Sequence, residues 1–357
     1  MPTVTELRRR QILGLAAAGL AAPAWAARRD TPVELAAAWR DETPSYRVGR
    51  LALAGEALVL RASVEVPTRA HALLAEPGGA LLAVARRPGD WLLRFTREGR
   101  ALQWQWIEPD RAFTGHLALS ADGRRLFSGE TDLDSGAGLI GVRDARSLEK
   151  LAEWPSHGLD VHELLPRGEG ELWVANGGIR TQAETGRLKL DLPAMDSSLV
   201  CLDAGTGALR GQWRVPDARL SLRHLAWRPD GRLGIAIQAE HAQAAERLAA
   251  PILAVFDGQA LHLAQGQPSL AGYGGDIAAS AEGFAIGCPR SGGVARFDAQ
   301  GRWQGLTPLP EACALAEGRH PQEGLWAGGR GQVLQLPAGR GKRLARDIEL
   351  DNHWIRL

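Results

Sequence analysis

The sequence is poor in cysteine and methionine, with three cysteines and two methionines among 357 residues. No CxxCH motif occurs, which excludes covalent attachment of a c-type haem. Met1 and Met195 are the two methionines, too few for a methionine-rich copper(I) carrier. Because the number of cysteines is odd, at least one is unpaired within the chain. The sequence leaves open the disulfide state of Cys201, Cys288 and Cys313.

Net charge and long apolar runs are also lacking. The formal net charge is +1 and charges of both signs are interspersed, so we expect no nucleic-acid partner. No stretch after the N-terminus is long enough to span a bilayer, so we predict no membrane span in the mature chain. Residues 136–141 match GxGxxG, but they precede a predicted strand and open no helix, so no NAD site is expected. No nucleophile-elbow or Walker motif specifies a covalent mechanism.

Glycine and proline, in contrast, are plentiful: 43 glycines and 20 prolines suit a fold of many short strands and turns. An internal repeat runs through the chain, for example HLALSADGRRLF from His116 and HLAWRPDGRLGI from His224. The openings of the repeat are His71, His116, His162, His224, Asp276, Cys313 and His353. They lie 37 to 62 residues apart. Such a period, built from strand and turn signals, is typical of a β-propeller.

The number of openings predicts an all-β fold, a seven-bladed β-propeller. The chain ends in DNHWIRL, which supplies one strand but not the rest of a blade. The segment from Tyr46 to Val66 supplies strands without an inner partner. We therefore expect the N-terminal and C-terminal strands to pair in one composite blade, which hides the sheet edges and closes the ring. Six or eight blades remain open if the weak repeat at Cys313 is miscounted.

The N-terminus has the features of an export signal. The sequence RRQIL at residues 9–13 is similar to the twin-arginine consensus, and an apolar stretch then leads to the small-residue site AWA at 24–26. The predicted organisation is a twin-arginine signal peptide at 1–26, a linker at 27–45 and the propeller at 46–357. The expected location is the periplasm of a Gram-negative bacterium. An ordinary secretory signal or an uncleaved anchor is the alternative.

Recurrence at one position of the repeat points to a shared site. The first strand of a propeller blade lies nearest the axis, so residues at its start in successive blades face one another. We therefore predict a ring of side chains at the channel mouth that could ligate a metal: His71, His116, His162, His224, His353 and Asp276. Neutral imidazoles are good ligands for iron, copper and zinc. The alternative is a structural hydrogen-bonding role repeated by blade duplication, as in WD-type repeats.

Several longer segments carry a resemblance: SHGLDVHE at 156–163, ANGGI at 175–179, GRLKLDL at 186–192, SLRHLA at 221–226 and the terminal DNH. In these the chain resembles a twin-arginine-exported family catalogued as domain of unknown function 1513. The resemblance implies a seven-bladed propeller encoded beside imelysin-type periplasmic proteins and a di-haem oxidoreductase, in clusters associated with iron acquisition. Residues carried over outside the ring form a candidate loop or anion site: Glu130, Asp132, His157, Glu163, Asn176, Arg187, Lys189 and Arg223.

Three classes of function follow. The first is a metal-binding propeller in periplasmic iron or copper acquisition, holding Fe, Cu or Zn in the ring. The second is a non-catalytic platform for an imelysin-like or cytochrome-type partner. The third is an oxidoreductase or lyase, with histidines as acid and base and with Arg187, Lys189 or Arg223 binding an anionic substrate. The sequence does not decide whether a reaction is catalysed.

Overall fold

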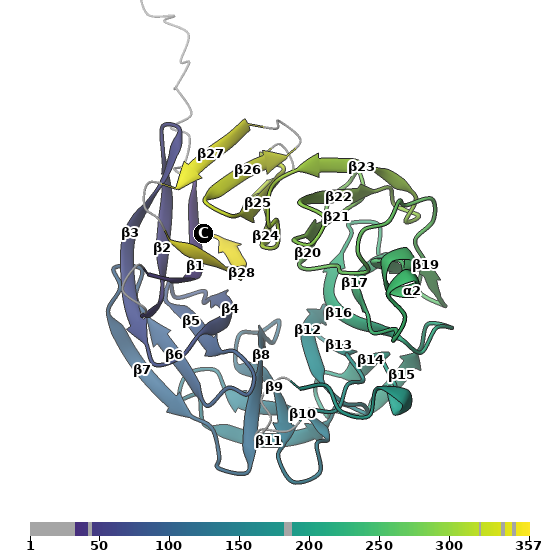
Figure 1. The fold of residues 1–357 in the computed structure, drawn as a ribbon. Coiled ribbons are helices and arrows are strands. Elements are labelled where there is room, and N and C mark those ends of the chain that lie inside the picture. The colour runs from purple at the N-terminus through teal and green to yellow at the C-terminus, as the bar shows by residue number, and fades with distance from the viewer. Residues whose placement is uncertain (1–32, 42–44, 182–187, 321–322, 337–339, 345–347) are drawn as a thin grey trace, which may run out of the picture. The chain divides into compact units, whose positions relative to one another are not determined.

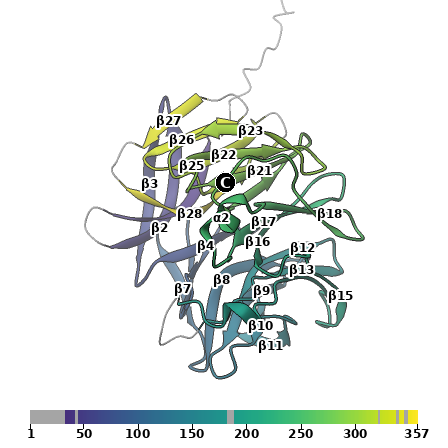
Figure 2. The same cartoon turned by 45° about the vertical axis from the view of Figure 1, so that its right-hand side comes forward.

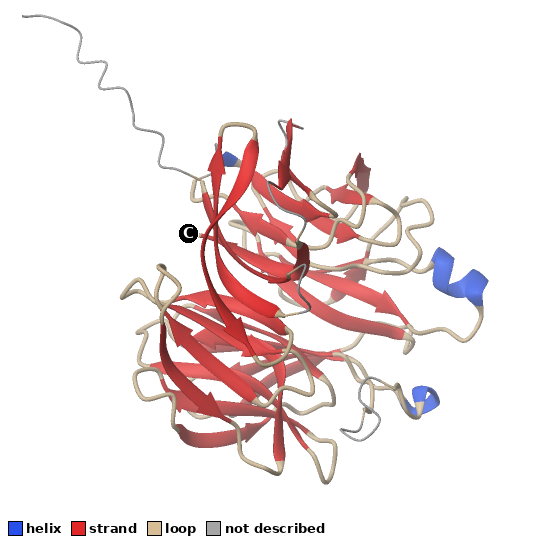
Figure 3. Ribbon diagram, turned by 60° about the vertical axis from the view of Figure 1, so that its left-hand side comes forward, coloured by secondary structure: helices blue, strands red, loops and turns tan. Residues whose placement is uncertain are grey.

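The computed structural model describes residues 33–41, 45–181, 188–320, 323–336, 340–344 and 348–357. The unit Val33–Leu357 is built almost entirely of strands (Figure 3). Its antiparallel sheets form a ring of seven blades (Figure 1), so the predicted fold class is confirmed. The predicted signal peptide, residues 1–26, lies outside the described residues. Among the described residues, no helix has the length and apolar character needed to cross a membrane.

Six blades follow one another along the chain, each with four antiparallel strands numbered from the axis outwards. The first two blades consist of β4 (Ala70–Ala75), β5 (Leu81–Ala85), β6 (Trp91–Phe95) and β7 (Ala101–Trp106), and of β8 (Arg111–Leu119), β9 (Arg125–Asp132), β10 (Gly138–Asp144) and β11 (Lys150–Pro155). The third and fourth consist of β12 (Val161–Arg167), β13 (Glu171–Asn176), β14 (Ser198–Asp203) and β15 (Leu209–Trp213), and of β16 (Leu220–Trp227), β17 (Leu233–Ala239), β18 (Leu253–Phe256) and β19 (Leu261–Leu263). The fifth and sixth consist of β20 (Ile277–Ala279), β21 (Phe284–Cys288), β22 (Gly293–Phe297) and β23 (Trp303–Pro308), and of β24 (Leu315–Glu317), β25 (Leu325–Gly329), β26 (Gln332–Leu336) and β27 (Arg340–Leu344).

The seventh blade is composite, as expected. Its strand order is β28 (Glu349–Arg356), β1 (Glu34–Arg40), β2 (Tyr46–Ala54) and β3 (Ala57–Val66). The expected pairing needs a correction, because β28 pairs with β1, whose residues fall in the predicted linker 27–45, rather than with the segment that begins at Tyr46. Strand β1 lies between β28 and β2, and both of its faces are buried. Its central residues LAAAW are therefore all apolar and do not alternate with polar residues as in a half-buried strand.

The blades pack face to face through large side chains. Trp173 on β13 stacks on Trp213 of its own blade, with ring centroids 5.4 Å apart, and contacts Phe256 of the following blade at 5.3 Å. The same cluster includes buried leucines and isoleucines of β16 and β17. Such packing holds the innermost strands of successive blades beside one another around the axis (Figure 1).

Each of the five repeat histidines lies on an innermost strand where its pairing register is interrupted. The interruptions lie between Ala70 and Leu73, Phe113 and Leu117, Val161 and Leu164, Leu222 and Leu225, and Leu350 and Trp354. A β-bulge leaves residues out of the ladder and changes the direction of their side chains. The interruptions therefore account for imidazoles that turn out of their sheets toward the axis.

Two long connections extend from the second strands of adjacent blades. The connection after β13 contains the 3₁₀ turn η2 (Leu192–Ala194), and the connection after β17 contains the helix α2 (Ala244–Ala249) (Figure 2). Residues of both connections line one pocket of about 380 Å³. The two connections therefore lie on the same face of the propeller.

Candidate functional site

The five repeat histidines converge on the propeller axis, as predicted, and we call them the histidine cluster: His71, His116, His162, His224 and His353. Neighbouring imidazoles lie close together, with ring centroids 4.5 Å apart for His162 and His224, 4.5 Å for His224 and His353, and 4.8 Å for His71 and His116. The cluster differs from the expected open ring in being buried, since no member is more than 8% exposed.

A chain of polar contacts fixes the tautomer of two of these histidines. An Arg223 guanidinium nitrogen lies 3.2 Å from His162 Nδ1, and because guanidinium only donates, Nδ1 accepts and the His162 proton is on Nε2. That Nε2 lies 3.1 Å from His224 Nε2 and donates to it. His224 then carries its own proton on Nδ1, which faces Glu163 Oε2 across 3.5 Å. Neither ring nitrogen of His162 is therefore available to a metal, because the Nδ1 lone pair accepts from Arg223 and Nε2 carries the proton.

His353 is oriented by a carboxylate in a similar way. Its Nδ1 lies 3.2 Å from Asp276 Oδ2, the same oxygen that accepts the backbone N–H of Leu315 at 2.9 Å. Asp276 also accepts its neighbouring backbone N–H, from Ile277. The carboxylate is thus held by β20 and β24 and turns Nε2 of His353 away from itself, toward the cluster.

Burial controls protonation within the cluster. It holds four pKa values well below 6.5, with neighbouring histidines and arginines adding to the effect, in His71, His116, His162 and His224. Burial also lowers the pKa of His353, but Asp276 outweighs it and the net shift is upward. Burial raises the pKa of Glu163 to about 7. The cluster therefore holds four neutral imidazoles and one that is paired with a carboxylate.

Two sets of three histidines place ligand atoms within 4.8 Å of one another: His71 with His116 and His162, and His116 with His224 and His353. Several buried ring nitrogens have no hydrogen-bond partner, including His116 Nε2 and His353 Nε2. The first set contains His162, whose lone pair accepts from Arg223. The second set fits a metal better, because His224 and His353 each turn one nitrogen to a carboxylate, the usual arrangement of a ligating imidazole.

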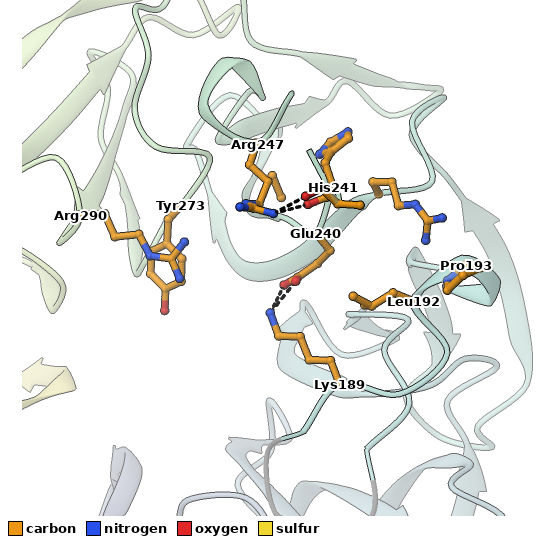
Figure 4. A pocket seen from close by; sticks show the side chains of 11 residues that line it. Lys189, Leu192, Pro193, Glu240, His241, Arg247, Tyr273 and Arg290 are labelled. Carbon is orange, nitrogen blue, oxygen red and sulfur yellow. Dashed lines mark hydrogen bonds and ion pairs between the residues drawn. The ribbon is translucent and has the colours of Figure 1, made fainter. Parts of the chain in front are cut away.

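A larger cavity of about 470 Å³ opens beside the cluster, and we call it the basic cavity. Its lining consists of Arg69, Arg86, Arg87, Lys189, Arg223, Gln238, Tyr273, Arg290 and Asn352. A smaller cavity of about 30 Å³ connects the two sites, because it shares Arg86, Arg87 and Gln238 with the basic cavity and also touches His71, His162 and His224. Figure 4 shows Arg290 across the Tyr273 ring and Lys189 extended toward Glu240 in the adjoining pocket.

The sequence matches the family described as "Protein of unknown function (DUF1513)" over residues 64–357. The chain belongs to the DUF1513 family. No curated protein matches it.

Two solved structures are similar to this DUF1513 protein, and the first of them supports the fold alone. The C-terminal WD40 domain of Sif2 is 11% identical with a TM-score of 0.52, covering 91% of this chain and 83% of that chain. A protein of unknown function from Bacteroides caccae is also 11% identical, with a TM-score of 0.49, covering 77% of this chain and 93% of that chain.

The structure brings only some of the candidate anion-site residues of the DUF1513 protein together. Lys189 and Arg223 line the basic cavity, and Glu163 contacts the histidine cluster. Arg187 lies outside the described residues. The others do not line the basic cavity: Glu130, Asp132, His157 and Asn176.

The positions of these four side chains explain their separation from the cavity. Glu130 is fully buried inside its blade and pairs with Arg143 Nη2 at 2.7 Å. Asp132 accepts backbone N–H groups of its own turn. Asn176 is buried and donates to the Ser156 carbonyl at 2.9 Å. The His157 side chain is exposed.

Sequence reasoning missed several residues of the basic cavity, namely Arg69, Arg86, Arg87 and Arg290. These arginines lie before β4, after β5 and after β21, outside the aligned part of the repeat. It also missed Asp160, a buried carboxylate that pairs with Arg87 and Arg223. The pair Arg86–Arg87 could have indicated the cavity, because it directly follows the buried strand LLAVA. The end of that strand pairs with the start of β4, where His71 lies.

The three cysteines are unpaired, so no disulfide joins them. Burial raises the pKa of Cys201 to about 11 and that of Cys288 and Cys313 to about 12. A thiol with such a pKa is protonated at neutral pH and is a poor nucleophile. Cys313 touches the small cavity beside the histidines, but as a thiol rather than a thiolate.

Proposed function

We propose that this protein binds one divalent transition-metal ion through His116, His224 and His353. The observation that carries the proposal is the pair of carboxylate-oriented imidazoles next to His116, with ligand atoms of all three within 4.8 Å of one another. Around an ion with bonds of about 2.0–2.1 Å, tetrahedrally arranged nitrogens lie roughly 3.4 Å apart, so small side-chain rotations suffice.

The donor set limits which ions fit. Three imidazoles suit Zn, Cu, Ni and Fe(II) once His353 has lost its proton from Nε2, and the thiol of Cys313 is not part of the set. Asp276 orients His353 from outside and raises the basicity of its ring nitrogens, and Glu163 lies beside His224 with its Oε2 3.5 Å from Nδ1. With three protein ligands an ion keeps an open position, which the site could offer to a water or to an oxygen of a bound molecule.

The wider biological setting is also part of the proposal. The twin-arginine-like sequence at residues 9–13 supports export to the periplasm. We extend the proposal to a role in iron or copper acquisition, which is the setting that the resemblance described in the sequence analysis implies. Fractionation of cells with and without a functional twin-arginine translocase tests export. Replacement of Arg9 and Arg10 by lysine should retain the chain in the cytoplasm, whereas export of that variant would contradict the twin-arginine route.

Calorimetry on the mature protein tests the metal site. The metal-free protein is titrated with Zn(II), Cu(II) and Fe(II), and the visible absorption of Co(II) reports nitrogen coordination. We expect one ion per chain at micromolar affinity or tighter, and loss of binding in His116→Gln and in His224→Gln. His262→Gln is the control, because His262 lies in an exposed pair with Asp257.

Thermal unfolding establishes that each variant is folded before its binding is compared. If the wild-type protein binds none of these ions at micromolar concentration, or if His116→Gln binds as well as wild type, the metal proposal fails. The platform for an imelysin-like or cytochrome-type partner would then be the function to test.

A further inference from the structure

Every charged side chain that lines the basic cavity is a cation. Six arginines and lysines from four blades meet there: Arg69, Arg86, Arg87, Lys189, Arg223 and Arg290. The carboxylates that contact them, Asp160, Asp351 and Glu240, do not belong to the lining. A cavity whose walls carry charge of one sign concentrates the opposite charge inside it.

The carboxylates hold the cations in place. Asp160 contacts both Arg87 and Arg223, and its Oδ2 lies 2.8 Å from Arg223 Nη1. Asp351 Oδ1 lies 2.8 Å from Arg69 Nη2. Side chains already held by such pairs lose little conformational freedom when they bind a ligand, so the cavity is organised in advance.

Two of the cations lie in surroundings that disfavour their charge. Arg223 is 1% exposed, so its charge is held away from bulk water. Burial lowers the pKa of Lys189, and Arg223 and Arg290 add to this effect although Glu240 pairs with Lys189 at 2.5 Å. An anion placed among these three side chains would offset the repulsion between them.

Neutral groups complete the lining. Gln238 and Asn352 carry amides, and Tyr273 carries a hydroxyl, so each can donate a hydrogen bond in addition to the charged donors. Guanidinium groups bind carboxylate and phosphate oxygens in a planar, two-pronged manner. The volume of about 470 Å³ suits a small molecule rather than a protein segment.

We propose that the basic cavity is a binding site for a small multivalent oxyanion, a molecule with two or more carboxylate or phosphate groups. The site is separate from the metal ligands, because none of the three proposed ligands lines the cavity. It does not require a metal. The small cavity that reaches both sites places such an anion next to the histidine cluster.

Calorimetry at low ionic strength tests this site with citrate and pyrophosphate as probes, which separates carboxylate from phosphate recognition. Acetate serves as the monovalent control. Metal is removed beforehand on a chelating resin, because soluble chelators such as EDTA are themselves multivalent carboxylates. We expect sub-millimolar binding of at least one probe, weakening with added salt, and no measurable binding of acetate.

Two variants remove cations from the lining without touching the histidines. Arg290→Gln and Lys189→Gln should each weaken binding by about tenfold, the usual effect of losing a charged hydrogen-bond donor. Arg302→Gln is the matched control, since Arg302 is exposed in the turn before β23 and does not line the cavity. We expect the control to bind like wild type.

The proposal is overturned if neither citrate nor pyrophosphate binds, or if acetate binds as well as they do. Equal losses in Arg302→Gln and Arg290→Gln would also overturn it, because they would show a general effect of surface charge. His116→Gln should retain anion binding even though it loses the metal, so failure of one proposal is distinguishable from failure of the other.

Discussion

The Nε2 atoms of His162 and His224 lie 3.1 Å apart at the buried centre of the propeller, and the proton between them belongs to His162. Arg223 imposes this order, because its guanidinium occupies the other nitrogen of His162. The contact between Arg223 and His162 Nδ1 thus keeps His162 from acting as a metal ligand. His224 Nε2 is an acceptor in this arrangement and can accept a metal in place of the proton.

The two sets of three histidines can be separated by mutation. We expect His353→Gln to abolish metal binding and His71→Gln to change the dissociation constant by no more than a few-fold, because His71 belongs only to the set that includes His162. Titration with Co(II), followed by visible absorption, measures both variants. Loss of binding in His71→Gln with retention in His353→Gln would assign the metal to the other set.

Asp276 should act on the metal through His353. Asp276→Asn keeps an acceptor for the Leu315 N–H but removes the negative charge beside His353 Nδ1. We expect metal affinity to fall by about 10- to 100-fold, the usual effect of removing a carboxylate behind a ligating histidine.

The metal-free form of the same variant gives a second measurement. The pKa of His353, which Asp276 raises in wild type, should fall in Asp276→Asn and can be followed by NMR. An unchanged His353 pKa would show that the Asp276 carboxylate does not raise the pKa of this imidazole. Any loss of metal affinity in Asp276→Asn would then need another explanation.

The repeat pattern predicted the histidine cluster because every member occupies the same place in its blade. A side chain that recurs at the start of the innermost strand must point toward the axis wherever the ring closes, and His71 and His353 meet at 4.6 Å although they lie far apart in sequence. The order of protons among the histidines could not be predicted, since it depends on Arg223 and Asp160 and on distances that no spacing reveals.

The sequence repeat did not predict the basic cavity. Apart from Arg223 on β16, its cations come from connections whose lengths differ between blades, so no alignment brings Arg69 and Arg290 together. Strand β1 was missed for a different reason. Its run from Leu35 to Trp39 is buried on both faces, and a short apolar run without alternation is not distinguishable from other buried segments by period alone.

Gly115 allows the close approach of His71 to the next blade. Its φ is +113°, and a Cβ at this position would lie 2.6 Å from His71 Cδ2. We expect Gly115→Ala to lower the free energy of unfolding by about 2 kcal/mol or more, from backbone strain and displacement of His71, and to perturb the cluster. Gly55→Ala is the control, because Gly55 has a φ of +58° but nothing within 4 Å of the added Cβ.

Chemical denaturation of both glycine variants provides the comparison. The control should lose only about 1 kcal/mol, the cost of the left-handed conformation. Equal losses in the two variants would mean that the contact with His71 does not matter.

Ring closure depends on the burial of β28 against its neighbours. Trp354 is 3% exposed and packs against the position of Gly328 on β25. We expect Trp354→Ala to cost about 3–5 kcal/mol in unfolding free energy. Trp106→Ala, at a tryptophan that is 53% exposed, should cost less than about 1 kcal/mol. Thermal and denaturant unfolding would measure both, and similar losses in the two would contradict a special role for the closing strand.

Stability of the metal-free protein should fall as the pH drops below about 6.5, the unperturbed value for histidine. Burial holds the pKa of four histidines well below that value: His71, His116, His162 and His224. Below pH 6.5 the unfolded chain therefore takes up protons that the folded protein does not. Each such histidine contributes a slope of about 1.4 kcal/mol per pH unit, with stability fully present above the unfolded pKa.

Two groups oppose this trend. The raised pKa of His353 stabilises the folded state below about pH 6.5, and that contribution is lost as the pH rises through the raised value. Glu163, with its pKa raised to about 7, likewise favours the folded state at lower pH. Because four histidines act against these two groups, we expect a net loss of at least about 1 kcal/mol between roughly pH 6.5 and 5.5. Urea denaturation of resin-treated protein across this range measures it. Stability that stayed constant or rose on acidification would show that the buried imidazoles are not held neutral.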